Sequence, residues 1–231
     1  AQYWAQADFS GSLPHALTQG QVGNVQNAYP HVKGVTSIAL GDMETVEVDT
    51  GSMQMPMQMQ TAVDLKSFMR IVKWPGLDTP AQQEMVLARL NNPSQFQDVA
   101  SAWFNTPDDA VPAVIATASA QELGVKPGQT FTTIGPLGQV TVFVVAEVDG
   151  MPPANILFDY PMYNLIYQAQ SSGLGIITTA PINYIWLKTD GSIQSLQHVR
   201  QALGVGPLHL FTFYDQQATA QELARNPLNR N

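Results

Sequence analysis

The two ends of this 231-residue sequence carry a similar order of β-rich and helix-like segments, and this repetition limits the folds that the chain can adopt. The spacing of apolar residues predicts the order β-α-β-β in the first part of the chain and β-α-β in the last part. The segments are residues 3–9, 13–29, an extended run with β-rich parts at 35–40 and 45–50, and a second extended run at 53–63 in the first part, and 183–189, 193–204 and 208–214 in the last part. Together the two parts can supply one α+β lobe.

The middle of the chain interrupts this repeat with short helices and strands. Proline and glycine separate most of them, and Thr79-Pro80 has the residues of a helix N-terminus. The segments are helical at 64–74, 79–90, 95–104, 119–123 and 161–169, and extended at 113–117, 130–134, 139–148 and 155–158. We therefore predict an α+β fold: a split ferredoxin-like lobe (β-α-β-β…β-α-β) at residues 1–64 plus 182–216, with an inserted α/β-hairpin-rich second lobe at residues 65–181.

Charge and cysteine content exclude several classes of function. The net charge is −8, only 12% of residues are charged, and the ten Lys and Arg residues are scattered along the chain. Nucleic-acid binding needs clustered basic residues, and so does an electrostatic hold on anionic lipids. The absence of cysteine excludes disulfides, thiolate metal ligands and cysteine nucleophiles. Because the start has no signal-peptide pattern and no apolar run could span a bilayer, we expect a soluble chain or a soluble fragment.

The segment 51–60, GSMQMPMQMQ, places four of the nine methionines at alternate positions. In a strand, this spacing puts Met53, Met55, Met57 and Met59 on one face and the glutamines on the other. We expect the methionine face to point into the core and the glutamine face toward water. Two alternatives stay open: an exposed, adaptable methionine surface for a partner, and a Cu(I) site, because thioethers are soft ligands.

Other side chains give little sign of catalysis or metal binding. The four histidines, His15, His31, His198 and His209, do not have the spacing of a paired metal-ligand motif, so we interpret them as surface or packing residues. Ser119 has no nucleophile motif around it and is expected to cap a short helix. We predict no catalytic, cofactor-binding or metal-binding residue in this chain.

Four acidic residues gather at Asp42, Glu44, Glu47 and Asp49, but their spacing is not that of a calcium-binding loop. In a strand, Glu47 and Asp49 would share one face with Thr45, which predicts a solvated strand face. A weak cation site is the remaining alternative for this run.

Several segments, in this order, resemble the ectodomains of FtsX-like permeases. They are residues 59–74 (MQTAVDLKSFMRIVKW), 112–132 (PAVIATASAQELGVKPGQTFT), the hairpin strand 139–148, residues 185–204 (IWLKTDGSIQSLQHVRQALG) and residues 222–231 (ELARNPLNRN). The most specific part is LGVKPGQ, in which glycine and proline fix a tight turn between a short helix and a strand. Gln129 stands where an acidic residue is common in the family, and the methionine run has no family counterpart.

The resemblance implies that the chain is the MacB-like periplasmic core domain of an FtsX-like ABC-transporter permease, on the extracytoplasmic face of a bacterial cytoplasmic membrane. Such a domain has no catalytic residues, and it couples ATP hydrolysis by a separate cytoplasmic subunit to movement, substrate export or partner engagement outside. The implied partners are the transmembrane part of the same permease and its cytoplasmic ATPase subunit, with a second permease copy or an extracytoplasmic partner protein as further candidates. The ferredoxin-like lobe would be membrane-proximal, and residues 217–231 would lead to a transmembrane helix.

Residues 64–65 and 180–183, where the chain passes between the predicted lobes, are candidate hinges. Two other functions stay open. One is an extracytoplasmic protein that binds a small molecule between its lobes, or Cu(I) through the methionine strand. The other is a hydrolase with a dispersed triad, for which no local nucleophile motif is present.

Overall fold

The computed structural model describes residues 7–17, 32–72, 74–135, 138–151, 155–173, 179–205 and 209–225. Its internal contacts divide the chain into two compact units. Unit 1 consists of Ala1–Leu40, Arg70–Lys73 and Pro181–Asn231, and unit 2 consists of Gly41–Met69 and Trp74–Ala180. Unit 1 therefore takes its chain from both ends of the sequence, and unit 2 is inserted between them. The lobe boundaries given above, as limits of separately folding domains, stay a prediction.

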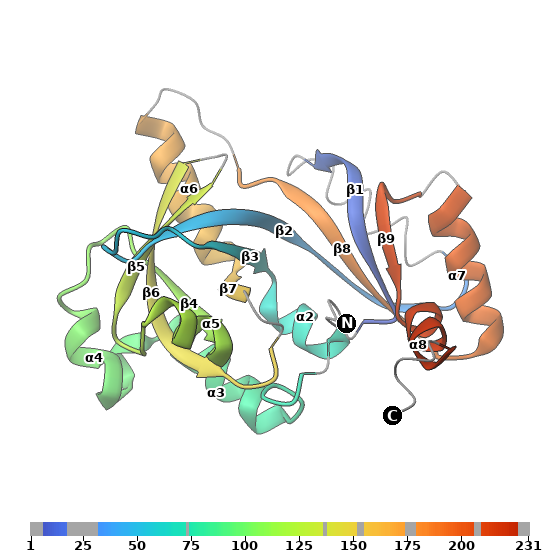
Figure 1. The fold of residues 1–231 in the computed structure, drawn as a ribbon, viewed down its shortest axis with the longest axis horizontal. Coiled ribbons are helices and arrows are strands. Elements are labelled where there is room, and N and C mark those ends of the chain that lie inside the picture. Colours follow the sequence, from blue (N-terminus) through green and yellow to red (C-terminus); the bar gives the residue numbers. More distant parts are fainter. Residues whose placement is uncertain are drawn as a thin grey trace. The chain divides into compact units, whose positions relative to one another are not determined.

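Unit 1 contains a sheet with the strand order β2-β8-β1-β9 (Figure 1). Its elements are β1 (Phe9–Leu17), the first residues of β2 (Val35–Asp49), β8 (Ile182–Thr189), α7 (Ile193–Val205), β9 (Thr212–Asp215) and α8 (Gln216–Arg225). β1 pairs antiparallel with both β8 and β9, and α7 connects β8 to β9. This arrangement is that of a split ferredoxin-like lobe, in which the insertion follows the second strand. The predicted α+β fold class is confirmed.

The start of the chain differs from the prediction. The sequence predicts a strand at residues 3–9 and a helix at 13–29, whereas β1 begins at Phe9 and continues to Leu17. Between Phe9 and Ser12 this strand pairs with neighbours on both sides, and that pairing outweighs the helix-like spacing. Residues 1–6 and 18–31, which hold the remainder of both predicted elements and His31, lie outside the described residues.

Helix α7 begins at the cap that residues 190–192 predict. The backbone N–H of Ser192 donates to Asp190 Oδ1 at 2.9 Å, and the backbone N–H of Ser195 donates to Ser192 Oγ at 3.2 Å. The Ser192 backbone N–H and the hydroxyls of Ser195 and Ser192 donate to the Asp190 carboxylate and lower the pKa of Asp190. The buried apolar face of the helix consists of Leu196, Val199 and Leu203. Ile193, which the periodicity assigns to the same face, is 69% exposed, so that assignment is wrong.

Unit 2 contains a ring of six paired strands. The order is β3-β7-β4-β6-β5-β2, and β2 also pairs with β3, so the hydrogen-bonded ladder returns to its start. The members are the later residues of β2, β3 (Met57–Val63), β4 (Val111–Ala116), β5 (Thr130–Gly135), β6 (Gly138–Val148) and β7 (Asn155–Asp159). β3 pairs parallel with β7 and β4 with β6, while the other pairs are antiparallel. Strands β4 to β7 lie within two residues of their predicted positions.

Strand β2 is one element of 15 residues and joins the two β-rich parts that the sequence shows at 35–40 and 45–50. Gly41 and Asp42 interrupt the β-rich pattern, but they pair with Val63 and Ala62 of β3. Pairing with a distant segment therefore outweighs the local break. As a result, one strand contributes to unit 1 as far as Leu40 and to unit 2 from Gly41 onward.

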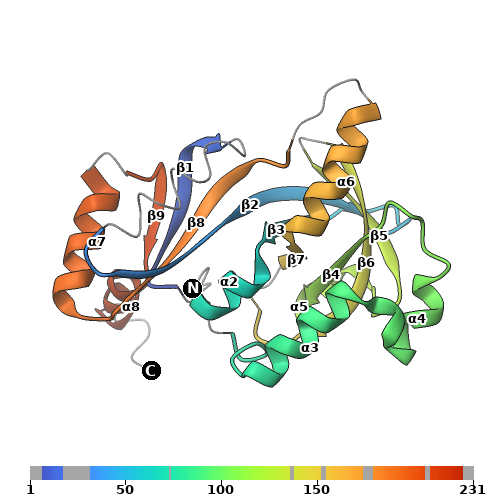
Figure 2. The ribbon, with the colours of Figure 1, turned by 180° about the vertical axis from the view of Figure 1, so that it is seen from behind.

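The inner face of the ring is a shared hydrophobic core. Its fully buried members include Val46, Val48, Val111, Ile115, Val142, Val144, Ile156 and Phe158. Helices α5 (Thr117–Leu123) and α6 (Tyr160–Gly173) add side chains to the same core. The other described helices are α2 (Leu65–Ile71), α3 (Pro80–Asn91), the short 3-10 helix η2 (Pro93–Gln95) and α4 (Gln97–Trp103). Figure 2 shows α3 beside β4 and β6, on the outside of the ring.

Helix α3 begins with the cap that Thr79-Pro80 predicts. Thr79 Oγ1 accepts the backbone N–H of Gln82 at 3.3 Å, and Gln82 Oε1 accepts the backbone N–H of Thr79 at 3.1 Å. We expect Thr79→Ala to lower the free energy of unfolding by about 1 kcal/mol, because it removes the first of these bonds. Urea denaturation measures the difference. The Thr79→Ser variant keeps the hydroxyl and should stay near wild type; a Ser variant as unstable as the Ala variant would contradict the capping role.

Candidate functional site

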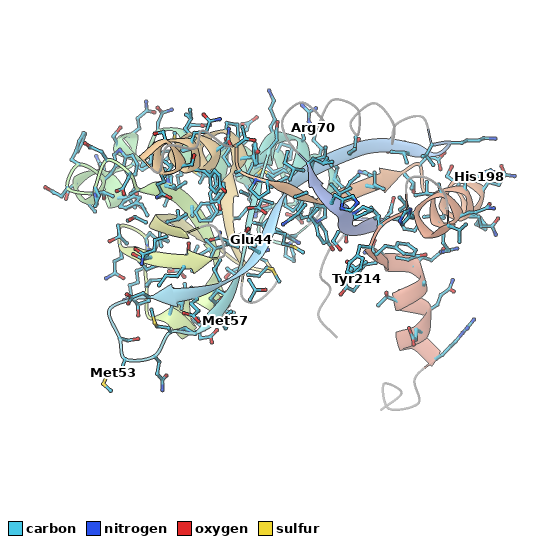
Figure 3. The ribbon with its side chains drawn as sticks, turned by 90° about the horizontal axis from the view of Figure 1, so that it is seen from above. Glu44, Met53, Met57, Arg70, His198 and Tyr214 are labelled. Atoms are coloured by element: carbon cyan, nitrogen blue, oxygen red, sulfur yellow. The ribbon has the colours of Figure 1, made fainter. Side chains whose placement is uncertain are left out.

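The connection between β2 and β3 carries the methionine segment to the surface of unit 2. Met57, the first residue of β3, pairs with Glu47 of β2, and the backbone N–H of Val48 donates to the carbonyl of Pro56 at 2.9 Å. The ladder therefore extends to Pro56, and the preceding residues form the turn. Figure 3 shows Met53 at the tip of this connection, where its side chain points away from the ribbon.

The methionine face of β3 points outward, so the prediction that it packs in the core is wrong. Met53 is fully exposed, and Met55 and Met57 are 42% and 54% exposed. Gln58 and Gln60, by contrast, are 1% and 4% exposed and share their face of the strand with buried core residues of the ring. The period of two is as predicted, but the inner and outer faces are exchanged.

Polar groups from other elements explain why the glutamines of β3 face inward. The Gln58 amide Nε2 donates to Glu122 Oε2 of α5 at 3.0 Å, and the Gln60 amide Nε2 donates to the Tyr163 hydroxyl of α6 at 3.3 Å. Glu44 lies directly opposite Gln60 on β2. A buried amide is tolerated where it makes hydrogen bonds, and these three partners supply them.

The side chains of Glu44, Gln58, Gln60, Glu122 and Tyr163 form a polar cluster. Some buried oxygen atoms in and around this cluster have no hydrogen-bond partner in the described part of the chain. Gln58 Oε1, Gln60 Oε1 and Thr133 Oγ1 are buried and have no hydrogen-bond partner among the residues that the structure describes. Next to Gln60 there is a small cavity of about 10 Å³, whose walls include Glu44 and Tyr163. The cluster therefore presents carboxylate, amide and phenol oxygens to one narrow space.

Two carboxylates of β2 belong to the same cluster. Asp42 is 2% exposed, and burial raises its pKa to about 8, with the neighbouring Glu44 carboxylate adding to the shift. Burial also raises the pKa of Glu44, against which a hydrogen bond with Gln60 acts. The pair can therefore hold or release a proton near neutral pH. Glu47 lies on the opposite, solvated face, as predicted.

Three tyrosines of α6 are close enough to these carboxylates for the negative charge to raise the pKa of their hydroxyls. Burial, followed by the charge of Asp42, raises the pKa of Tyr160 to about 12. The same causes, with Glu44 contributing, raise the pKa of Tyr163 and Tyr167. The phenols thus stay protonated and act as hydrogen-bond donors or acceptors at physiological pH. Sequence reasoning missed this cluster, although Asp42 and Glu44 stand at the period-two spacing of the inner face.

The three histidines that the structure describes lie at the surface, and His31 lies outside the described residues. His15, His198 and His209 are all exposed. Within the described ranges, no three His, Cys, Asp or Glu side chains come together in a way that could hold a metal ion. Ser119 is buried inside α5, which begins at Thr117, so the prediction that Ser119 caps this helix is wrong.

Unit 2 also has two open grooves on its surface. One, of about 680 Å³, lies between the α4 end and the start of β5, and the other, of about 650 Å³, lies between α3 and the end of β6. Neither groove is lined by Asp42, Glu44, Met53, Met55 or Met57. Both grooves are therefore separate from the polar cluster and from the exposed methionines of the β2–β3 connection.

None of the described helices has both the length and the apolar character needed to cross a bilayer.

Comparison with known proteins gives matches only among solved structures; no family model and no curated protein matches the chain. The chain is similar to the extracellular domain of the noncanonic ABC-type transporter YknZ from Gram-positive bacteria, with 9% sequence identity and a TM-score of 0.43, over 83% of this chain and 88% of that one. It is also similar to the periplasmic region of MacB from Actinobacillus actinomycetemcomitans, with 9% identity and a TM-score of 0.44, over 96% of this chain and 95% of that one. The resemblance stated from the sequence is to the same kind of transporter domain.

Proposed function

We propose that this chain is the non-catalytic extracytoplasmic domain of an FtsX/MacB-like ABC-transporter permease. Several sequence segments resemble those of this family and occur in the same order along the chain, which supports the proposal. The observation that carries it is the topology: a ferredoxin-like unit is interrupted after its second strand by a complete second unit. Both ends of the chain belong to unit 1, which suits a domain that is attached to a membrane through both ends.

The geometry of the most specific segment, LGVKPGQ, also supports the proposal. Gly124 ends α5 in the left-handed conformation with φ of 66°, and Gly128 has φ of 87°. Both angles favour glycine. Gln129 Oε1 accepts the backbone N–H of Lys126 at 2.9 Å, a bond that an acidic side chain could equally accept. The residue that departs from the family pattern therefore keeps the hydrogen bond of the turn.

In this role the domain transmits movement. ATP hydrolysis by a cytoplasmic subunit would move the transmembrane part of the permease, and unit 1 would move with it. The chain passes between the two units near residues 40–41, 69–74 and 180–181. We propose hinges at these crossings, the last of which falls at the candidate position 180–183; the other candidate position, 64–65, lies within unit 2. We also propose that residues 217–231 lead into a transmembrane helix. A second permease copy or an extracytoplasmic protein would receive the movement.

Spin-label distances in the full-length permease with its ATPase subunit test the proposal. Because the chain lacks cysteine, two introduced cysteines in it define one distance. Gln201→Cys on α7 and Gln121→Cys on α5 place exposed labels in units 1 and 2. We expect the distribution of distances between these labels to change between the nucleotide-free and the ATP-trapped complex, because movement is transmitted through the hinges.

The matched control is Gln121→Cys with Glu84→Cys, since both positions are exposed and lie in unit 2. Its distances should be the same in both nucleotide states. Identical distributions for the inter-unit pair in every nucleotide state would contradict transmission of movement. A gene without an apolar stretch of about 20 residues after Asn231 would contradict the permease assignment itself.

A further inference from the structure

Three methionines on the β2–β3 connection expose their side chains instead of packing them. Met53 is fully exposed and Met55 and Met57 are about half exposed, whereas Met69 and Met151 of the same unit are 4% and 6% exposed. Single apolar residues on a surface need no explanation, but three within five positions form a patch. The thioethers that the sequence predicts in the core are therefore accessible to solvent and to ligands.

Hydrogen bonds within the connection shape its backbone independently of the methionines. The backbone N–H of Gly51 donates to Asp49 Oδ1 at 2.7 Å, and the Ser52 hydroxyl donates to the carbonyl of Gln54 at 2.7 Å. Gly51 has φ of 80°, which glycine adopts without strain. The turn therefore holds Met53 at the tip while leaving its side chain free to rotate.

The three thioethers can converge on one ion. Met55 and Met57 lie two positions apart on either side of Pro56, whose carbonyl accepts the backbone N–H of Val48 of β2. In the extended backbone of a strand, side chains two positions apart leave on the same side about 6.5–7 Å apart. Methionine has three rotatable bonds beyond its Cα, which allows two such sulfurs to meet between their attachment points. Met53 lies at the tip of the connection, where its side chain points away from the ribbon (Figure 3), and a rotation of this side chain would be needed to add a third sulfur. Glu47, exposed and paired with Met57, places a negative charge beside them.

We propose that Met53, Met55 and Met57 bind one soft monovalent cation, Cu(I) or Ag(I), through their thioether sulfurs. Thioethers select such ions, while Ca²⁺ and Mg²⁺ require several oxygen ligands. Of the three glutamines of the same segment, whose oxygens could serve a hard cation, Gln58 and Gln60 are turned into the ring, and Gln54 alone is exposed. The site is independent of the transport role proposed above, and either can be correct without the other.

Methyl NMR of the whole chain with ¹³C-labelled methionine methyl groups tests the site directly. Ag(I) serves as the redox-stable probe, and Cu(I) is added under anaerobic, reducing conditions. We expect the methyl signals of Met53, Met55 and Met57 to shift together and to saturate at one equivalent of metal. The signals of the isolated exposed residues Met85 and Met162 should not move. Mg²⁺ and Ca²⁺ should leave all nine signals in place.

Leucine variants give the matched control. Met55→Leu/Met57→Leu keeps the size and apolar character of the side chains, and the double variant should bind Ag(I) at least about tenfold more weakly, which corresponds to about 1.4 kcal/mol. Met85→Leu/Met162→Leu removes two exposed thioethers elsewhere and should bind like wild type. Equal binding by the two double variants, or signal shifts that simply follow exposure, would overturn the proposal. An unchanged urea midpoint confirms that each variant is folded.

Discussion

The Asp42→Asn variant is expected to keep its stability at alkaline pH, where the wild-type chain should lose about 3 kcal/mol between pH 5.5 and pH 9. Burial raises the pKa of Asp42 from 3.8 to about 8 in the folded chain. The folded state therefore binds the proton more tightly than the unfolded state. The resulting stability is complete below about pH 4 and is lost as the pH rises through 8. Asparagine has no proton to lose, so the part of this pH dependence that comes from Asp42 should disappear.

Urea denaturation at the two pH values measures this effect, and hydrogen exchange of the β2 and β3 amides assigns it to unit 2. Asp109→Asn is the matched control, because it makes the same chemical change at an exposed position. It should keep the wild-type pH dependence. A wild-type chain equally stable at both pH values, or an Asp42→Asn variant that loses as much stability at pH 9 as the wild type, would show that Asp42 does not hold its proton in this way. Glu44, whose pKa is also raised, contributes in the same direction.

The Gly11→Ala variant is expected to lose about 3 kcal/mol of stability and to detach β9 from β1. Gly11 lies opposite Phe213 in the β1–β9 ladder. A Cβ atom at this position would stand 2.0 Å from the carbonyl oxygen of Thr212 and 2.7 Å from Leu210 Cδ1. Because the nearest atom is backbone, the clash can be relieved only by moving the strand.

Thermal unfolding gives the loss of stability, and hydrogen exchange in β9 and α8 shows whether the strand detaches. Gly204→Ala is the control within the same unit, because no atom lies within 4 Å of the added Cβ and the residue is in helix α7. Alanine favours helix over glycine, so this variant should be neutral or gain up to about 1 kcal/mol. A Gly11→Ala chain with wild-type stability and exchange would contradict the close approach of β9.

The sequence predicted correctly those elements that depend on residues close together in the chain, such as helix caps and hairpin turns. Thr79 and Pro80 mark the start of α3 because capping depends on neighbouring residues. The hairpin of β5 and β6, and the helix that follows residues 190–192, were predictable for the same reason. The closed ring of unit 2 was not, because it depends on the parallel pairing of β3 with β7, about 95 residues away.

The methionine strand shows the limit of such reasoning in one place. Alternation identifies which residues of β3 share a face, and that part was correct. Which face is buried depends on the groups that meet it, and here these are Glu44 across the ladder, Glu122 of α5 and Tyr163 of α6. Their polar atoms form hydrogen bonds with Gln58 and Gln60 inside the ring. Hydropathy alone therefore predicts the wrong face of β3 to be buried. The sequence left a Cu(I) site at the methionines open as an alternative, and their exposure in the structure is what favours it.

The continuity of β2 has a consequence for the order in which the chain folds during synthesis. By Ala180 the ribosome has delivered every residue of unit 2, whereas β1 and the first part of β2 still lack β8 and β9. The inserted unit can therefore be complete while its host is still a set of unpaired strands, which are prone to associate with other chains. Pro14, exposed in β1, cannot donate to a foreign strand and offers some protection during that interval.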